Sequence, residues 1–190
     1  MNNRQKEIFK QLENLYLEMD RAWEQVAILY GFQCNGCDEN CCETEFFHHT
    51  FVEKDYLLKG FNELLPPQII AAKKRAKKVS TKRAIASKKG ESIRIMCPLN
   101  QDEKCIIYKF RPMICRLHGL PHELLKSNSL NPILSSGCKA GSEIFDQAGY
   151  IKFDRTPFYL KMAEIEKEYL NRVVGKFVRN KETIAQMLLD

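Results

Sequence analysis

The sequence has no long hydrophobic run. Its longest apolar stretch, residues 26–32, contains Gly31 and is far shorter than the roughly 20 residues that a transmembrane helix needs. The first residues, MNNRQKE, include no apolar segment of the kind found in a signal peptide. These absences argue against a membrane-spanning or secreted protein, and we expect a soluble, cytoplasmic one.

Several catalytic signatures are also missing. The chain has no glycine-rich phosphate-binding loop, no dinucleotide-binding fingerprint and no Ser-His-Asp set. Repeats and low-complexity segments are absent too. Of its 190 residues, 44% are hydrophobic and 28% are charged, which is typical of a globular protein. This length predicts one domain over residues 1–190.

Hydrophobic periodicity predicts a mainly α-helical fold. Over residues 5–30 apolar side chains recur every three or four positions, and Gly31 follows as a stop signal. Further helices are expected over 53–65, over 68–89, after Pro112, after Pro157 and over 182–189. Residues 92–96 alternate like a short strand or extended arm, and residues 126–141 have a loop composition. We expect long N- and C-terminal helices around a loop-rich, cysteine-ligated metal centre.

Eight cysteines are the most unusual feature of the composition. Without a secretory signal their thiols should stay reduced, so metal binding is the leading explanation for them. The first group has the spacing C-x2-C-x3-C-C, and the second has C-P-x6-C-x9-C with one more cysteine after it. The predicted ligand pool, which defines a metal-binding core over residues 34–138, is Cys34, Cys37, Cys41, Cys42, Cys97, Cys105, Cys115 and Cys138.

The adjacent pair Cys41 and Cys42 bears on the identity of the metal. On a helix the two side chains would point about 100° apart, so the pair suits several metal atoms in one pocket better than one tetrahedral zinc ion. An iron–sulfur cluster in a redox or catalytic role is therefore favoured, with zinc as the alternative. The spacing leaves open whether there is one site or two.

Residues close to Cys115 are candidates for supporting roles. Four thiolates around such a metal leave a charge near about −2, which nearby donors must balance. Arg111 and Arg116 flank Cys115 and can supply them, although both are equally compatible with the surface. His118, three residues after Cys115, is a less favoured ligand. His48, with no partner motif nearby, is expected at a polar edge.

The cysteine pattern also resembles that of a known family. Its motifs, in chain order, are Cys34, Cys37, Cys41-Cys42, Cys97-Pro98-Leu99 and the run from Cys105 to Arg116, which includes Ile107-Tyr108 and Arg111-Pro112. Over roughly residues 34–138 they resemble the YkgJ-type cysteine cluster family, described as a zinc- or iron-chelating domain. The resemblance implies that all eight cysteines bind metal. It implies no reaction, although some relatives resemble flagellin lysine N-methylase, so an oxidoreductase or methyltransferase-like activity enters by analogy alone.

Positive charge is concentrated in one segment. The net charge is +6, yet residues 71–94 contain ten Lys or Arg and one Glu, so that segment carries +9 and the rest carries −3. Such a segment can bind phosphates or an acidic partner, but it has no aromatic residue to stack on bases and is often only a solvated face. The alternative function is a structural-zinc module whose basic helix contacts nucleic acid or an acidic partner through Lys73, Lys74, Lys77 and Lys78.

Overall fold

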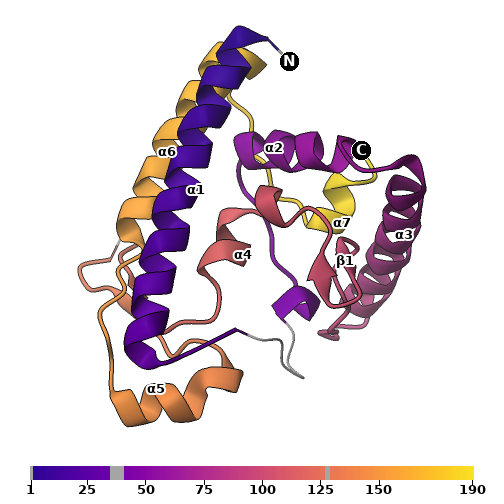
Figure 1. The fold of residues 1–190 in the computed structure, drawn as a ribbon. Coiled ribbons are helices and arrows are strands. Elements are labelled where there is room, and N and C mark those ends of the chain that lie inside the picture. The colour runs from indigo at the N-terminus through magenta and orange to yellow at the C-terminus, as the bar shows by residue number, and fades with distance from the viewer. Residues whose placement is uncertain (1, 35–40, 127–128) are drawn as a thin grey trace. The chain divides into compact units, whose positions relative to one another are not determined.

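The computed structural model describes residues 2–34, 41–126 and 129–190, and most of them are helical (Figure 1). The prediction of a mainly α-helical chain is therefore confirmed. Contacts divide the chain into two units. The first unit comprises Met1–Glu39 and Met113–Phe177, and the second comprises Asn40–Pro112 and Val178–Asp190. In the part of the chain described, no helix combines the length and the apolar character needed to cross a bilayer.

The first unit is built around the long N-terminal helix α1. Its elements are α1 (Asn3–Tyr30), α4 (Met113–Leu117), β3 (His122–Leu124), β4 (Ile133–Ser135), η3 (Lys139–Gly141), α5 (Ser142–Ala148), α6 (Thr156–Tyr169) and the π-helical turn η4 (Leu170–Val174). Helix α1 ends where predicted because Gly31 adopts φ 65°, a left-handed conformation that favours glycine.

Helices α1 and α6 lie side by side along their length (Figure 1). Most of the apolar stripe of α1 is buried, with Ile8, Leu12 and Met19 at 0% exposure, as its period of three to four residues predicts. Near the end of α6, Tyr169 stacks on Phe9 with 6.1 Å between ring centroids. The packing of α1 on α6 therefore forms the main core of this unit.

The second unit carries the basic helix. Its elements are η1 (Cys41–Glu43), α2 (Phe51–Asn62), α3 (Pro66–Lys88), β1 (Asn100–Gln101), β2 (Lys104–Cys105), η2 (Tyr108–Phe110) and α7 (Ile184–Met187). Small residues of α3 face inward: Ala72 and Ala76 are fully buried and belong to the same hydrophobic cluster as Leu57 and Leu99. This small-residue face lets α3 pack closely on the unit while its lysines stay in solvent.

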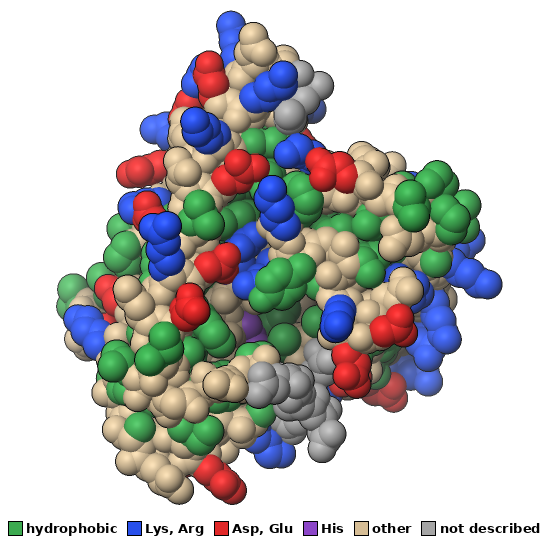
Figure 2. All heavy atoms as spheres, viewed as in Figure 1, with side chains coloured by type: hydrophobic (Ala, Val, Ile, Leu, Met, Phe, Trp, Pro, Cys, Tyr) green, Lys and Arg blue, Asp and Glu red, His purple; other side chains and the backbone are tan. Residues whose placement is uncertain are grey.

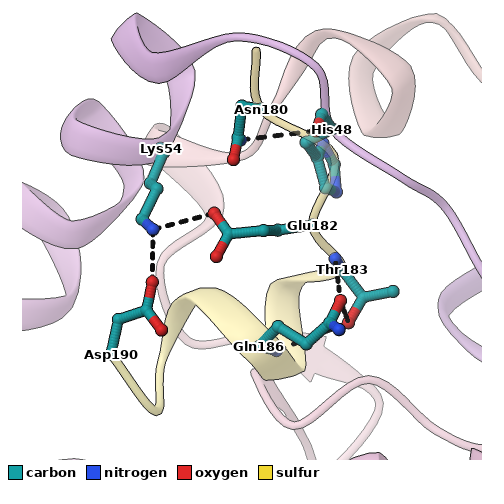
Figure 3. Close-up of polar contacts among 7 residues, drawn as sticks. All are labelled: His48, Lys54, Asn180, Glu182, Thr183, Gln186 and Asp190. Carbon is teal, nitrogen blue, oxygen red and sulfur yellow. Dashed lines mark hydrogen bonds and ion pairs between the residues drawn. The ribbon is translucent and has the colours of Figure 1, made fainter. Parts of the chain in front are cut away.

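The C-terminal residues complete the second unit (Figure 3). The His48 N–H donates to the Glu182 carbonyl at 2.8 Å, and the Glu182 N–H donates back to the His48 carbonyl at 3.1 Å. Lys54 of α2 donates to the carboxylates of Glu182 at 2.8 Å and Asp190 at 2.5 Å. His48 is consequently buried, at 3% exposure, and the expectation that it lies on a polar edge is wrong.

Several short elements differ from the sequence expectation. Residues 92–96 form no strand. The stretch 126–141, expected as loop, includes β4, which pairs antiparallel with β3. Helix α5 was not expected. It has only seven residues and buries one of them, Phe145, so it is too short to show an apolar stripe of helical period. Helices α2 and α3 lie within a few residues of their predicted bounds. The helix expected after Pro157 begins as predicted, but its apolar stripe was expected to reach Phe177, whereas α6 ends at Tyr169 and η4 at Val174.

Candidate metal centre

Four of the predicted ligands belong to the second unit, where a backbone contact joins two of their segments. Cys41 and Cys42 lie in the single turn η1. The Cys97 N–H donates to the Cys42 carbonyl at 2.8 Å, and the Ile95 N–H donates to the Glu43 carbonyl at 3.3 Å. The extended segment that ends at Cys97 therefore runs alongside η1, although the two are far apart in the sequence.

The hairpin β1–β2 brings a fourth cysteine to this segment. The Asn100 N–H donates to the Cys97 carbonyl at 3.0 Å, and Asn100 pairs with Cys105 across the hairpin. Its two turn residues, Asp102 and Glu103, have φ values of 51° and 64°. Two successive positive φ angles are typical of the type I′ turn, whose twist matches that of the paired strands. The turn thereby returns the chain so that Cys105 lies opposite Asn100.

The thiols of this group influence one another's protonation. A hydrogen bond with the Cys41 side chain lowers the pKa of the Cys42 thiol to about 6; burial opposes the shift, and the Asn100 side chain adds to it. Burial raises the pKa of the Cys97 thiol to about 12, backbone hydrogen bonds oppose this, and the charges of Cys42 and Cys105 contribute to it. One thiol therefore favours the thiolate at neutral pH, whereas a neighbouring thiol retains its proton.

The remaining described cysteines belong to the first unit. Cys34 is exposed after the end of α1, and Cys115 lies in α4. The Cys138 N–H donates to the Gly119 carbonyl at 2.7 Å, which holds Cys138 against the segment that follows α4. Cys37 lies outside the described residues.

An aromatic side chain fixes the turn beside Cys138. The Trp23 indole N–H donates to the His118 carbonyl at 2.9 Å. Gly119 has φ 108°, and a Cβ atom at that position would lie 3.9 Å from the Cys138 sulfur and from Trp23. Sequence periodicity assigned Trp23 only to the core of α1, so its link to the segment between Cys115 and Cys138 was missed. No local pattern signals a contact of this range.

His118 itself is half-buried, and its pKa is lowered, first by burial and then by the charge of Arg155. The neutral imidazole is the form that binds metal. Cys115 and His118 are thus chemically suited to ligation. No group of three or more metal-binding side chains is formed around them in the described part of the unit.

The two arginines expected to support the thiolates have other contacts. Arg116 is buried, pairs with Asp20 of α1 at 2.5 Å and lies 4.0 Å from the Tyr16 ring centroid. The Arg111 guanidinium lies 3.8 Å from the ring centroid of Tyr108. Arg116 therefore joins α4 to α1, and Arg111 packs on the nearby ring of Tyr108. Their role as donors to thiolates stays a prediction.

The seven predicted ligands that the structure describes thus divide between the two units. Within residues 2–34, 41–126 and 129–190, no group of three or more Cys, His, Asp or Glu side chains is arranged to hold a metal ion. The second unit nevertheless contains four thiols, the donor type that suits a soft metal. The segments that carry them are joined by backbone hydrogen bonds. Iron–sulfur and zinc binding both remain predictions.

Compared with known proteins, the chain matches no family model, no curated protein and no solved structure. The resemblance to the YkgJ-type family therefore rests on the cysteine motifs alone.

Proposed function

We propose that this protein is a thiolate metal-binding protein of the YkgJ type and that Cys41, Cys42, Cys97 and Cys105 form its first ligand group. The observation that carries the proposal is the 2.8 Å hydrogen bond from the Cys97 N–H to the Cys42 carbonyl. It joins the two cysteine motifs of the second unit. Four thiolates are the complement of one zinc ion or one four-iron cluster.

An iron–sulfur cluster is the preferred occupant. The side chains of Cys41 and Cys42 hydrogen-bond to each other, so both sulfurs face a common region. Neighbouring sulfurs can bind different iron atoms of one cluster, whereas one zinc ion needs four sulfurs at tetrahedral corners. Such a cluster would give the protein a redox or cluster-dependent catalytic role.

The other four cysteines of the sequence supply the second part of the proposed ligand pool. Cys34, Cys37, Cys115 and Cys138 add four thiols, enough for a second centre. Neutral His118 follows Cys115 and offers one nitrogen donor in the same unit. The number of metal atoms per chain separates one centre from two.

The test is metal analysis of the full chain purified without oxygen. We expect a brown protein with iron and sulfide in equal amounts, about four of each per chain for one cluster and about eight for two. Cys97→Ser should remove one centre and its visible absorption. The matched variant Cys34→Ser, at an exposed cysteine of the other unit, should leave that centre intact. A chain that holds neither iron nor zinc would overturn the proposal.

A second candidate function is a binding module with structural zinc. The observation that favours it is the exposure of the lysines of α3, including Lys73, Lys74, Lys77 and Lys78. A closed zinc site contributes to folding and performs no chemistry. A colourless protein with stoichiometric zinc would select this candidate over the cluster.

A further inference from the structure

Helix α3 presents a continuous face of lysines to solvent. None of its 23 residues is acidic. Its buried side consists of small residues packed in the core of the second unit, whereas the opposite side is exposed over its whole length. The exposed lysines are Lys73, Lys74, Lys77, Lys78, Lys82 and Lys88. Figure 2 shows Lys and Arg side chains gathered over this helix. We call these six residues the lysine face.

The two arginines of α3 point into the second unit instead. Arg75 donates through Nε to the Pro98 carbonyl at 2.8 Å. Arg83 pairs with Glu45 at 2.8 Å, and its side chain is only 12% exposed. The charge that α3 offers to a partner is consequently carried by lysine alone.

The lysine face has no intramolecular counter-charge. None of its six members forms an ion pair or a side-chain hydrogen bond with any residue that the structure describes. Lys74 and Lys78 are four residues apart, and like charges at this spacing repel and destabilise a helix. A polyanion bound along the helix would relieve this repulsion and release the counterions of both partners.

The chemistry of the face selects the kind of polyanion. Lysine ammonium groups bind phosphates as point charges, whereas arginine reads bases and phosphates in bidentate fashion. No aromatic residue is present in α3 to stack on unpaired bases. The distance from Lys73 to Lys88 along the helix is about 22 Å, and a turn of duplex is about 34 Å. The face therefore spans several phosphates of a double helix.

A lipid surface fits less well. Helices that lie in a membrane interface bury a broad apolar face among the lipids. The apolar side of α3 is already buried in the second unit, and only Ile70 and Ile85 are exposed among its large apolar residues, at 69% and 52%. An anionic membrane would therefore be held by charge alone.

We propose that the lysine face of α3 binds the phosphodiester backbone of duplex nucleic acid without reading its sequence. This inference rests on the binding-module candidate above, but it does not depend on which metal the cysteines hold. Duplex binding reports on the lysine face, and metal content reports on the cysteines, so the two proposals fail in different experiments.

The test is fluorescence anisotropy with the full chain and a labelled 20-base-pair duplex of mixed sequence, made as DNA and as RNA, over a range of KCl concentrations. We expect binding whose logarithmic salt dependence has a slope of about −0.9 for each phosphate neutralised on duplex DNA. Two unrelated duplex sequences should bind equally. The corresponding single strand should bind more weakly, because no aromatic platform holds its bases.

The decisive variant reverses four charges of the face: Lys73→Glu, Lys74→Glu, Lys77→Glu and Lys78→Glu. Its affinity for the duplex should fall at least about tenfold, and the salt slope should fall by about 3 to 4. The matched control reverses four exposed lysines of the first unit and changes the net charge equally: Lys6→Glu, Lys10→Glu, Lys167→Glu and Lys176→Glu. The control should retain the wild-type affinity and slope.

Three results would overturn the proposal. The first is an absence of salt-dependent duplex binding by the wild-type chain. The second is an equal loss of binding in the two charge-reversed variants, which would show that affinity depends on the net charge of the protein and not on the lysine face. The third is tighter binding to the single strand, or to vesicles with 30% phosphatidylserine, than to the duplex. The wild-type salt slope tests the proposal even if a variant fails to fold.

Discussion

At the scale of single residues, His48 is a buried histidine with an unusual environment. It is 3% exposed, and its Nε2 atom has no hydrogen-bond partner among the described residues. Burial lowers its pKa; the charge of Glu53 opposes the shift, and that of His49 adds to it. The folded protein therefore holds this imidazole neutral at a pH at which the unfolded chain begins to protonate it.

This environment predicts an acid-sensitive stability. As the pH falls below the ordinary histidine value of about 6.5, the unfolded chain binds a proton that folded His48 does not, so the free energy of unfolding decreases by up to about 1.4 kcal/mol per pH unit. His48→Gln should flatten this dependence in urea unfolding at pH 5 to 7. His49→Gln, at an exposed position, is the comparison variant: it removes only the smallest of the three contributions to the shift and should change the dependence much less than His48→Gln. Equal slopes in all three proteins would contradict the assignment.

The thiols of the second unit predict a second pH effect, on metal binding. Metal ligation requires thiolates. With the pKa of Cys97 at about 12, this thiol must lose its proton when metal binds at neutral pH, whereas Cys42, with a pKa of about 6, is already mostly deprotonated. Zinc affinity should therefore rise at least about tenfold per pH unit between pH 6.5 and 8.5. Competition with a chromophoric chelator measures this, and a pH-independent affinity would exclude Cys97 as a ligand.

At the scale of elements, the hairpin β1–β2 carries a conformational cost. Both of its turn residues have positive φ without being glycine, and the left-handed region costs a residue with a side chain about 1 kcal/mol relative to glycine. Neither Asp102 nor Glu103 is buried. The hairpin holds Cys105 opposite Asn100, so its turn is one determinant of the geometry of the proposed ligand group.

Glycine in the turn should therefore stabilise the protein. Glu103→Gly removes the side chain that disfavours φ 64° and should raise the free energy of unfolding by about 0.5 to 1 kcal/mol in urea titrations. Glu103→Val should lower it, because β-branched residues tolerate this conformation poorly. If the glycine variant is less stable than the wild type, the turn does not have the conformation described.

At the scale of the whole molecule, the chain leaves the second unit after Pro112 and returns to it at Val178. The returning segment forms α7, which begins with a capping box: the Thr183 N–H donates to the Gln186 side chain at 2.8 Å (Figure 3). Met187 and Leu188, both 1% exposed, enter the same core as the buried side of α3. The C-terminal residues are therefore part of the unit that carries both the proposed first ligand group and the lysine face.

This connectivity predicts that the C-terminal segment is essential to the second unit. Met187→Ala should lower the free energy of unfolding by about 2 to 5 kcal/mol through lost burial and a cavity. Leu189→Ala, at a neighbouring side chain that is 43% exposed, should change it by less than about 0.5 kcal/mol. Urea unfolding followed by circular dichroism measures both. Equal effects would show that the segment is not packed in the core.

Local patterns were sufficient for the long helices of this chain. An apolar stripe of period 3.6 buries one face, Gly31 ends α1 at a left-handed residue, and the proline pair at the start of α3 opens a helix whose small residues face the core. A basic helix over these residues was predicted as well, but its arginines were expected on the same solvated side as its lysines. Cysteine spacing identified eight candidate thiols, but it could not show which of them belong to which unit of the protein.

The contacts between distant segments were decided by the folded chain. Several contacts join residues from different elements. The backbone of Cys97 hydrogen-bonds to that of Cys42, and the backbone of His48 to that of Glu182. Arg75 and Arg83 turn inward to Pro98 and Glu45. Such contacts depend on how whole helices and hairpins pack against one another. Periodicity and spacing record only the neighbours of a residue along its own element, so the sequence could name the candidate ligands but not which of them meet.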